Sequence, residues 1–391
     1  MYDLINESEK DGFNRFGFHT LTELLLPVNR ILNLQNHHHL DFRLQSIYST
    51  LNFSNIVWHI MASTTPFPQG SIGYLAFPDQ ADFLLSELQE RFGISSQSIA
   101  GARRHQELFI FPPESLPEPL QGPHPQLAPY WCSTVLQDPV EISFTSIGEA
   151  ASALKAIQRS WAPYLTTSFR RGQLIQEKLP YMNLKPRQFP CKIPTSIAGL
   201  YSLTDQNTLI ASGSTTSPFP AGLVHLQEDH EHPPSRAYLK LQEALTHCQA
   251  LFQRMPQDGQ RCLDAGACPG GWTWVLVQLG CQVLSVDRSP LAPQLMEHPL
   301  VNFQKHDAFT LPPEELGAFD WIFSDVICYP SRLLEWIHRW LESGLCPNMI
   351  CTIKMQGRID WALVNEFASI PNSTVLHLHY NKHELTWIHC H

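Results

Sequence analysis

The segment from Leu263 to Trp274 joins an apolar strand pattern, an acidic residue and a glycine-rich turn, a combination suited to holding a nucleoside. Glycine lets the backbone approach a ligand that a Cβ would exclude. The run that follows, 272–279, is expected to form a helix whose free N–H groups face that ligand. The glycines stand at 266, 270 and 271 and therefore lack the G-x-G-x-x-G spacing of dinucleotide sites.

Polar residues also follow the other predicted strands of this region. The strand 281–286 ends at Asp287, about 20 residues after Gly266, where a carboxylate can accept hydrogen bonds from both ribose hydroxyls. A single aspartate after a strand is more often a helix cap or a turn residue. Five polar residues in register instead favour one crevice at the carboxyl ends of a parallel sheet, and we interpret it as an S-adenosylmethionine (SAM) site. The remaining strands and the residues after them are 301–304 with Asp307, 321–323 with Asp325, and 349–353 with Lys354.

Six motifs, in this order, resemble the FtsJ-type ribose 2′-O-methyltransferases, and among them the bacterial enzymes that methylate a cytidine ribose of large-subunit ribosomal RNA. The resemblance covers roughly residues 213–391, and Ala265 departs from the leucine that is commoner in the family. The motifs are S-R-A-Y-L-K at 235–240, D-A-G-A-C-P-G-G-W at 264–272, S-V-D at 285–287, S-D-V at 324–326, T-I-K at 352–354 and H-E-L-T at 383–386.

The resemblance implies an α/β fold, a Rossmann-like methyltransferase domain with a doubly wound, mostly parallel sheet. It implies S-adenosyl-L-methionine as the cofactor and RNA as the partner, either ribosomal RNA or a large-subunit precursor. The implied catalytic set is Lys240, Asp325, Lys354 and Glu384. The implied cofactor-binding residues are Asp264, Gly266, Ala267, Pro269, Gly270, Gly271, Trp272, Asp287, Asp307 and Asp325.

Two lysines among those residues suit transfer of a methyl group to a ribose. A 2′-hydroxyl is a poor nucleophile at neutral pH, so it must be held in line and lose its proton. Lys354 is the candidate base or alkoxide stabiliser, and Asp325 would orient it. Lys240 and Glu384 would balance the charges and position the ribose. Taken alone, Lys240 fits a solvated lysine on an amphipathic helix better than a catalytic role.

The N-terminal half has an α+β pattern. We expect an N-terminal extension at 1–53, an α+β RNA-binding region at 54–212 and the methyltransferase domain at 213–391. The resemblance implies a THUMP-like domain within the second of these. The expected elements are strands 56–61, 107–111 and 140–144, a helix 80–92 capped by Asp79 and stopped by Gly93, a proline-rich linker or long loop at 112–129, and a helix that a Ser146–Glu149 capping box opens and that runs to Trp161.

Residues 151–192 hold eight basic side chains and one acidic side chain, interleaved with aromatics. Such a composition is expected of a surface that holds phosphates and stacks on unpaired bases. The alternative is a solvated helix face beside ordinary core aromatics. The aromatics are Trp161, Tyr164, Phe169, Tyr181 and Phe189. The candidate RNA-binding residues are Lys155, Arg159, Arg170, Arg171, Lys185 and Arg187.

Composition narrows the class of protein further. The 391 residues carry a net charge of −10, which disfavours broad, non-specific nucleic-acid binding. No apolar run is long enough to span a membrane, the first residues lack the pattern of a signal peptide, and ten scattered cysteines suggest reduced thiols, so we expect a cytoplasmic enzyme. We expect no metal site, because the histidines near the C-terminus, expected to alternate along a last strand, match no common zinc spacing. The alternatives are action on transfer RNA or another ribose, and a catalytically silent RNA-binding or assembly protein.

Overall fold

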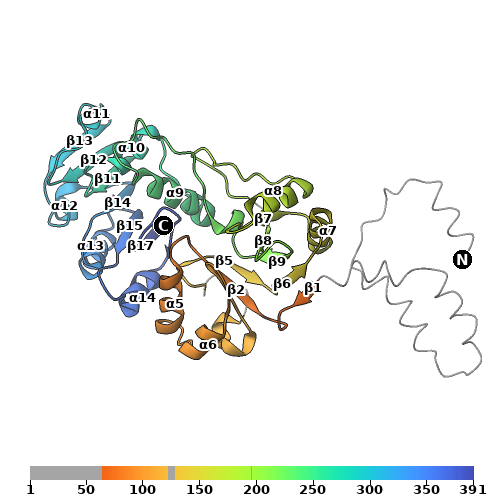
Figure 1. Ribbon diagram of the computed structural model, residues 1–391. Helices are drawn as coiled ribbons and strands as arrows, with labels where there is room; N and C mark the ends of the chain where they lie inside the picture. The colour runs from red at the N-terminus through yellow and green to blue at the C-terminus, as the bar shows by residue number, and fades with distance from the viewer. Residues whose placement is uncertain (1–63, 122–127, 195) are drawn as a thin grey trace, which may run out of the picture. The chain divides into compact units, whose positions relative to one another are not determined.

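The computed structural model describes residues 64–121, 128–194 and 196–391 of the chain. These residues form three β-sheets with helices packed against them, two sheets in the N-terminal half and one in the C-terminal half (Figure 1). The predicted strand 56–61 and the predicted extension 1–53 lie outside the described residues.

The C-terminal half is built on a seven-stranded sheet in the order β13-β12-β11-β14-β15-β17-β16. Strands β11 to β15 are parallel, and β17 runs antiparallel to both of its neighbours. The chain starts in the middle at β11, moves to one edge and then crosses to β14, so the strand order reverses between β11 and β14. The strands are β11 (Arg261–Ala265), β12 (Gln282–Asp287), β13 (Val301–Lys305), β14 (Trp321–Ser324), β15 (Asn348–Lys354), β16 (Ser373–Leu376) and β17 (Glu384–Cys390).

Helices cover both faces of this sheet, because successive buried residues of each strand point to opposite sides. Cys262 and Ile350 pack with α9 and α10, whereas their neighbours Leu263 and Cys351 pack with α13 and α14. The predicted doubly wound, mostly parallel sheet is thereby confirmed. The helices are α9 (Tyr238–Phe252), α10 (Gly271–Gln278), α11 (Pro293–Met296), α12 (Pro313–Leu316), α13 (Pro330–Ser343) and α14 (Trp361–Ser369).

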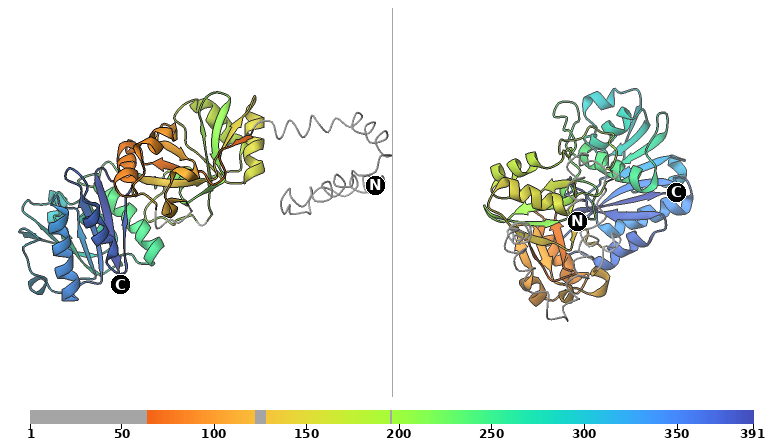
Figure 2. Two further views of the ribbon diagram at one scale, coloured as in Figure 1. Left: turned by 90° about the horizontal axis from the view of Figure 1, so that it is seen from below. Right: turned by 90° about the vertical axis from the view of Figure 1, so that its right-hand side faces the viewer.

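The N-terminal half has the predicted α+β character, with two five-stranded sheets in the orders β1-β6-β9-β8-β7 and β10-β5-β2-β4-β3. Its strands are β1 (Thr64–Pro66), β2 (Ile72–Ala76), β3 (Arg103–His105), β4 (Leu108–Phe111), β5 (Cys132–Gln137), β6 (Val140–Ser143), β7 (Trp161–Pro163), β8 (Gly199–Leu203), β9 (Thr208–Ser212) and β10 (Ser214–Thr215). Its helices are α5 (Ala81–Glu90), α6 (Ser96–Gly101), α7 (Ile147–Ile157) and α8 (Phe169–Lys178), and Figure 2 shows these segments from two further sides.

The proline-rich stretch is a loop within one sheet. It connects β4 to β5, and both of these strands pair with β2. Two short 3₁₀ turns bury Leu116 and Leu120, which are 3% and 2% exposed, so the described part of this loop belongs to the core. Of the two alternatives, linker or long loop, the structure therefore has the long loop.

Three details of the N-terminal helices differ from expectation. The cap of α5 is Gln80, and Asp79 instead adopts a left-handed backbone with φ of 60°. Helix α7 ends at Ile157, because Trp161 already belongs to β7. In the capping box, Ser146 Oγ accepts from the Glu149 N–H as predicted. The Glu149 carboxylate accepts from the backbone N–H of Thr145, one residue before the cap.

Candidate active site

The glycine loop between β11 and α10 packs directly against the loop after β14. Gly266 has φ of +82°, and a Cβ at this position would lie 1.9 Å from Val326 Cγ2. Only glycine fits both the backbone conformation and this approach. The close contact sets the predicted cofactor loop beside Asp325, the residue that precedes Val326.

The other end of the loop is fastened to the segment that leads into α9. A Cβ at Gly271 would lie 2.5 Å from Ser235 Oγ. The Trp272 indole N–H donates to the Ala237 carbonyl oxygen over 2.9 Å, and the side chain is buried. Because Lys240 stands in the first turn of α9, these contacts hold this candidate catalytic lysine and the loop in one piece of structure.

Asp264 lies beneath this loop and is 1% exposed. Its carboxylate accepts a hydrogen bond from Thr273 Oγ1 at 2.6 Å, and Thr273 Oγ1 also lies 2.8 Å from Ser285 Oγ. Burial raises the pKa of Asp264 to about 7, against the opposing effect of the Thr273 hydrogen bonds. This geometry gives Asp264 a part in tying α10 to the sheet, in addition to any contact with a cofactor.

Asp287 is the last residue of β12 and Asp307 follows β13, at the same edge of the sheet. Asp287 accepts from the Cys268 N–H at 3.1 Å and from the Ser289 N–H at 2.8 Å. Asp307 pairs with Arg288 at 2.5 Å and with Arg332 at 3.1 Å. Burial would raise the pKa of Asp307, but the Phe309 N–H and the two arginines lower it overall. The Asp287 carboxylate is thus held by two backbone N–H groups, whereas the Asp307 carboxylate is paired with two guanidinium groups.

The four residues of the implied catalytic set converge at the carboxyl end of β14 and β15. Lys354 Nζ lies 2.5 Å from Asp325 Oδ1, and Lys240 Nζ lies 3.2 Å from Asp325 Oδ2. Glu384 Oε1 is 2.7 Å from Lys240 Nζ and 4.0 Å from Lys354 Nζ. Glu384 reaches this place because β17 pairs with β15 in a register that sets it opposite Lys354.

The two lysines differ in proton affinity although they share the same carboxylates. Burial is the largest single influence on both lysines, and by itself it would lower the pKa of each. At Lys240 the nearby Asp325 and Glu384 outweigh burial, so its pKa is raised. At Lys354 the effect of burial exceeds the opposing effect of Asp325, and the positive charge of Lys240 acts in the same direction as burial. The pKa of Lys354 is therefore lowered. Lys354 is therefore the lysine better suited to accept a proton.

A cleft of 1410 Å³ opens onto this set. Lys240, Lys354 and Glu384 line it together with Ile327 and with Asp79 of the N-terminal half. The side chains of the two lysines therefore lie at one part of the wall of this cleft.

The loop before Glu384 is held by Glu243, a residue of α9 that is 2% exposed. Its carboxylate accepts from the N–H groups of His379 and Tyr380 at 2.9 and 3.0 Å. The expectation that the C-terminal histidines alternate along one strand is wrong, because β17 contains only His389 and residues 377–383 form the loop. In the described residues no three histidine, cysteine or acidic side chains are grouped so as to hold a metal ion.

Some of the candidate RNA-binding side chains are exposed, and others contact neighbouring residues. Lys155, Arg159, Arg170 and Lys185 are exposed. The Arg171 guanidinium donates to Thr145 O and Asn207 Oδ1, each at 3.3 Å, and lies 5.2 Å from the Phe144 ring centre. Arg187 lies over Phe219 at 5.8 Å. Of the aromatics, Phe169 and Tyr181 are exposed, whereas Trp161 is fully buried and belongs to the core, so only the first two are accessible to a ligand.

Four residues with a part in the site escaped the sequence analysis: Thr273, Arg288, Arg332 and Glu243. Arg288 directly follows a strand-end aspartate, a position that could have suggested a partner for Asp307. Glu243 lies one helical turn after Lys240, which was a further usable signal. Thr273 lies nine positions after Asp264, in the first turn of α10, so its place directly after the glycine loop was a usable signal. Arg332 contacts Asp307 from 25 positions further along the chain and gave no signal.

Comparisons with known proteins agree with the motifs. Residues 233–350 match the family model described as FtsJ-like methyltransferase. A ribosomal RNA large subunit methyltransferase M from Xanthomonas euvesicatoria is 32% identical over 215 residues, which are 54% of this chain and 58% of that protein. The protein of the same name from Xylella fastidiosa is 37% identical over 155 residues, 38% of this chain and 43% of that one. The matched part thus spans about half the length of these curated relatives.

Solved structures overlap only weakly with the chain. A Burkholderia thailandensis 1,6-didemethyltoxoflavin-N1-methyltransferase has a TM-score of 0.29 at 18% identity, covering 40% of this chain and 80% of that one. The magnesium protoporphyrin IX methyltransferase of Synechocystis has a TM-score of 0.30 at 15% identity, covering 39% and 79%. The family match and the named relatives confirm the predicted resemblance to the FtsJ-type methyltransferases, and the family supports SAM as the cofactor. In the described residues, every helix is too short or too polar to cross a membrane.

Proposed function

We propose that this chain is a SAM-dependent RNA methyltransferase that modifies a ribose 2′-hydroxyl, with large-subunit ribosomal RNA as its substrate and the cytoplasm as its place of action. One observation carries the proposal: two lysines and two carboxylates meet at the strand ends, beside a glycine loop and at the wall of a large cleft. The relatives named as ribosomal RNA methyltransferases support the choice of substrate.

The residues at the strand ends suit SAM. The Asp287 carboxylate uses one lone pair of each oxygen for a backbone N–H, which leaves acceptor capacity for the two ribose hydroxyls of a nucleoside. Gly266 and Gly270 have no side chain, and a Cβ at either position would collide with a residue packed against the loop. When bound, SAM supplies an electrophilic methyl group on a positively charged sulfur.

The four ionic residues would prepare the ribose. The lowered pKa of Lys354 lets a share of this side chain exist as a neutral amine that accepts the 2′-hydroxyl proton at Nζ. Asp325 holds that amine through the 2.5 Å contact. Lys240, with its raised pKa, remains an ammonium group that stabilises negative charge on the ribose oxygen, and Glu384 keeps Lys240 in place.

The test measures two quantities on the same proteins. Purified full-length chain would be given methyl-labelled SAM and ribosomal RNA, and the labelled nucleoside would be identified as a 2′-O-methyl product. We expect Lys354→Ala to lose transfer by about 10²–10⁴-fold, the usual contribution of a general base. SAM affinity measured by calorimetry should stay the same, because Lys354 acts on the nucleophile. Lys305→Ala, which removes an exposed lysine at the end of β13, is the control and should keep both.

Two results would overturn the proposal. A wild-type chain that binds SAM and transfers no methyl group to ribosomal RNA would instead favour a silent RNA-binding protein or a different RNA substrate, such as transfer RNA. A folded Lys354→Ala variant that loses SAM affinity and transfer to the same degree would make Lys354 a cofactor or structural residue.

A further inference from the structure

Two large side chains directly after the catalytic aspartate are left exposed. Ile327 is 83% exposed and Tyr329 is 67% exposed, whereas the residue between them, Cys328, is 8% exposed and packs in the core. The loop after β14 thus alternates, with Val326 and Cys328 packed against the core and Ile327 and Tyr329 presented outward. Exposed apolar side chains grouped beside an active site are characteristic of a binding surface.

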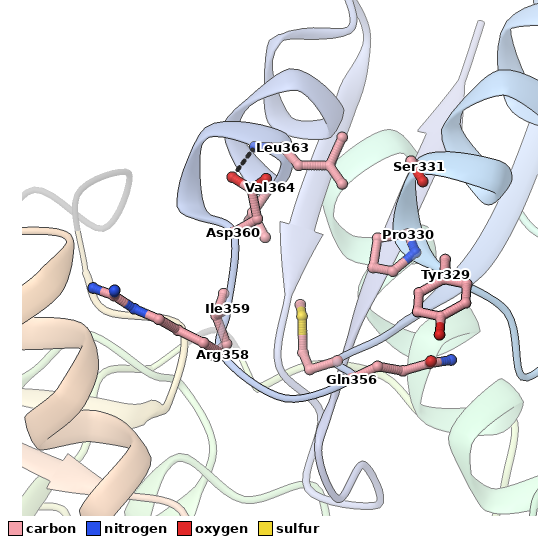
Figure 3. A pocket seen from close by; sticks show the side chains of 10 residues that line it. Tyr329, Pro330, Ser331, Gln356, Arg358, Ile359, Asp360, Leu363 and Val364 are labelled. Atoms are coloured by element: carbon pink, nitrogen blue, oxygen red, sulfur yellow. Dashed lines mark hydrogen bonds between the residues drawn. The ribbon is translucent and has the colours of Figure 1, made fainter.

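Both side chains border space that leads to Lys354. Ile327 lines the 1410 Å³ cleft with Lys240 and Lys354. Tyr329 lines a smaller hollow of 190 Å³, where Figure 3 shows its ring on the same side as the Gln356 side chain. Met355 and Gln356 line both spaces, so the hollow and the cleft meet at the two residues that follow Lys354.

The backbone that carries Tyr329 is fixed at both ends. On one side Cys328 is buried, and on the other Pro330 opens α13, whose Leu333 N–H donates to the Tyr329 carbonyl oxygen at 3.2 Å. A ring on such a backbone loses little conformational freedom when a ligand covers it. Every nucleobase has a flat face that can stack on an aromatic ring, and unpaired bases of RNA are held in this way.

We propose that Tyr329, flanked by Ile327, is a stacking platform for an unpaired base of the substrate RNA, next to the nucleotide whose ribose lies at Lys354. Gln356 lies in the same hollow and offers an amide donor and acceptor to the edge of that base. The platform rests on the proposed function, because it presumes that the cleft admits RNA. It adds a residue that selects single-stranded RNA and sets the position of the RNA strand in the cleft.

The test uses RNA binding, which is separable from methyl transfer. A fluorescein-labelled single-stranded 12-nucleotide RNA of mixed sequence would be titrated with the full chain and followed by anisotropy. Tyr329→Ala should weaken binding by about five- to 150-fold, the loss typical of one stacked base. Tyr329→Phe keeps the ring and should bind as the wild type does. Leu251→Ala removes another exposed hydrophobic side chain, 56% exposed, at the far end of α9 and is the control.

A second series places the base. A set of RNAs would carry a single abasic nucleotide at successive positions. The wild-type protein should bind more weakly when the abasic nucleotide stands at one particular position. Tyr329→Ala should bind that abasic RNA no more weakly than it binds the intact RNA. Tyr329→Ala binding RNA as tightly as the wild type would overturn the platform, whether or not the chain transfers methyl groups. If the wild type binds the RNA through Tyr329 and transfers no methyl group, the platform stands and the proposed enzymatic activity fails.

Discussion

Replacing Gly266 by alanine tests whether the glycine loop and the loop after β14 are one packed unit. The new Cβ would lie 1.9 Å from Val326 Cγ2, on a backbone whose φ is +82°. The left-handed conformation costs a non-glycine residue about 1–2 kcal/mol, and overpacking adds about 1–3 kcal/mol. We therefore expect Gly266→Ala to lower the free energy of unfolding by about 2–5 kcal/mol.

A second glycine separates the two costs. Gly259 has φ of +76°, and a Cβ there would meet no atom within 4 Å. Gly259→Ala should therefore show only the cost of the left-handed backbone, about 1–2 kcal/mol. The difference between the two variants then measures the contact with Val326.

The assay is urea unfolding of the full chain followed by tryptophan fluorescence, with SAM binding measured by calorimetry on the folded variants. Gly266→Ala should also weaken SAM binding, whereas Gly259→Ala should not. Adding Val326→Ala to Gly266→Ala should recover about 1–3 kcal/mol relative to the sum of the single changes. Equal destabilisation by the two glycine variants, with no recovery in the double variant, would refute the close packing of the two loops.

Three further predictions concern the cofactor, the base and the RNA. Asp287→Ala should weaken SAM binding by about 1.5–3 kcal/mol through the lost charged acceptor, and unchanged calorimetric affinity would remove Asp287 from the ribose site. Methyl transfer should rise with pH through the pKa of Lys354, since only the neutral amine accepts a proton. Lys240→Met should move this rise to higher pH, because the positive charge of Lys240 lowers the pKa of Lys354. A pH profile of Lys240→Met that is unmoved relative to that of Lys240→Arg would contradict the assignment. Arg170→Ala should make the salt dependence of binding to single-stranded RNA shallower by about 0.7 in logarithmic slope, and an unchanged slope would leave Arg170 a solvated surface charge.

The strand ends of the C-terminal sheet could be predicted because their signals are local. Each parallel strand is a short apolar run followed by a polar residue, and the shared sheet edge then gathers residues as far apart as Asp287 and Asp325. Lys354 follows the same rule. Glu384 could be placed only by resemblance, since its position depends on the antiparallel register of β17 with β15, which no local pattern specifies.

The errors arose where distant contacts override local preference. Asp79 has the residue type of a cap, yet its backbone is left-handed and α5 begins without it. The histidine spacing suggested a strand, but Glu243 binds the backbone of residues 379 and 380 and holds them in a loop. The neighbours of Arg171 were likewise not foreseen: its guanidinium lies against Phe144, a residue 27 positions earlier, and its predicted role in RNA binding stays a prediction. Packing of this kind is invisible to spacing and composition.

Mapping 2′-O-methyl nucleotides in large-subunit ribosomal RNA tests the central claim most directly. RNA would be compared from cells that lack this chain and from the same cells supplied with the wild type or with Lys354→Ala. The proposed function predicts one ribose that loses its methyl group in the deletion, regains it with the wild type and stays unmethylated with Lys354→Ala. An identical set of 2′-O-methyl positions in all these cells would contradict it.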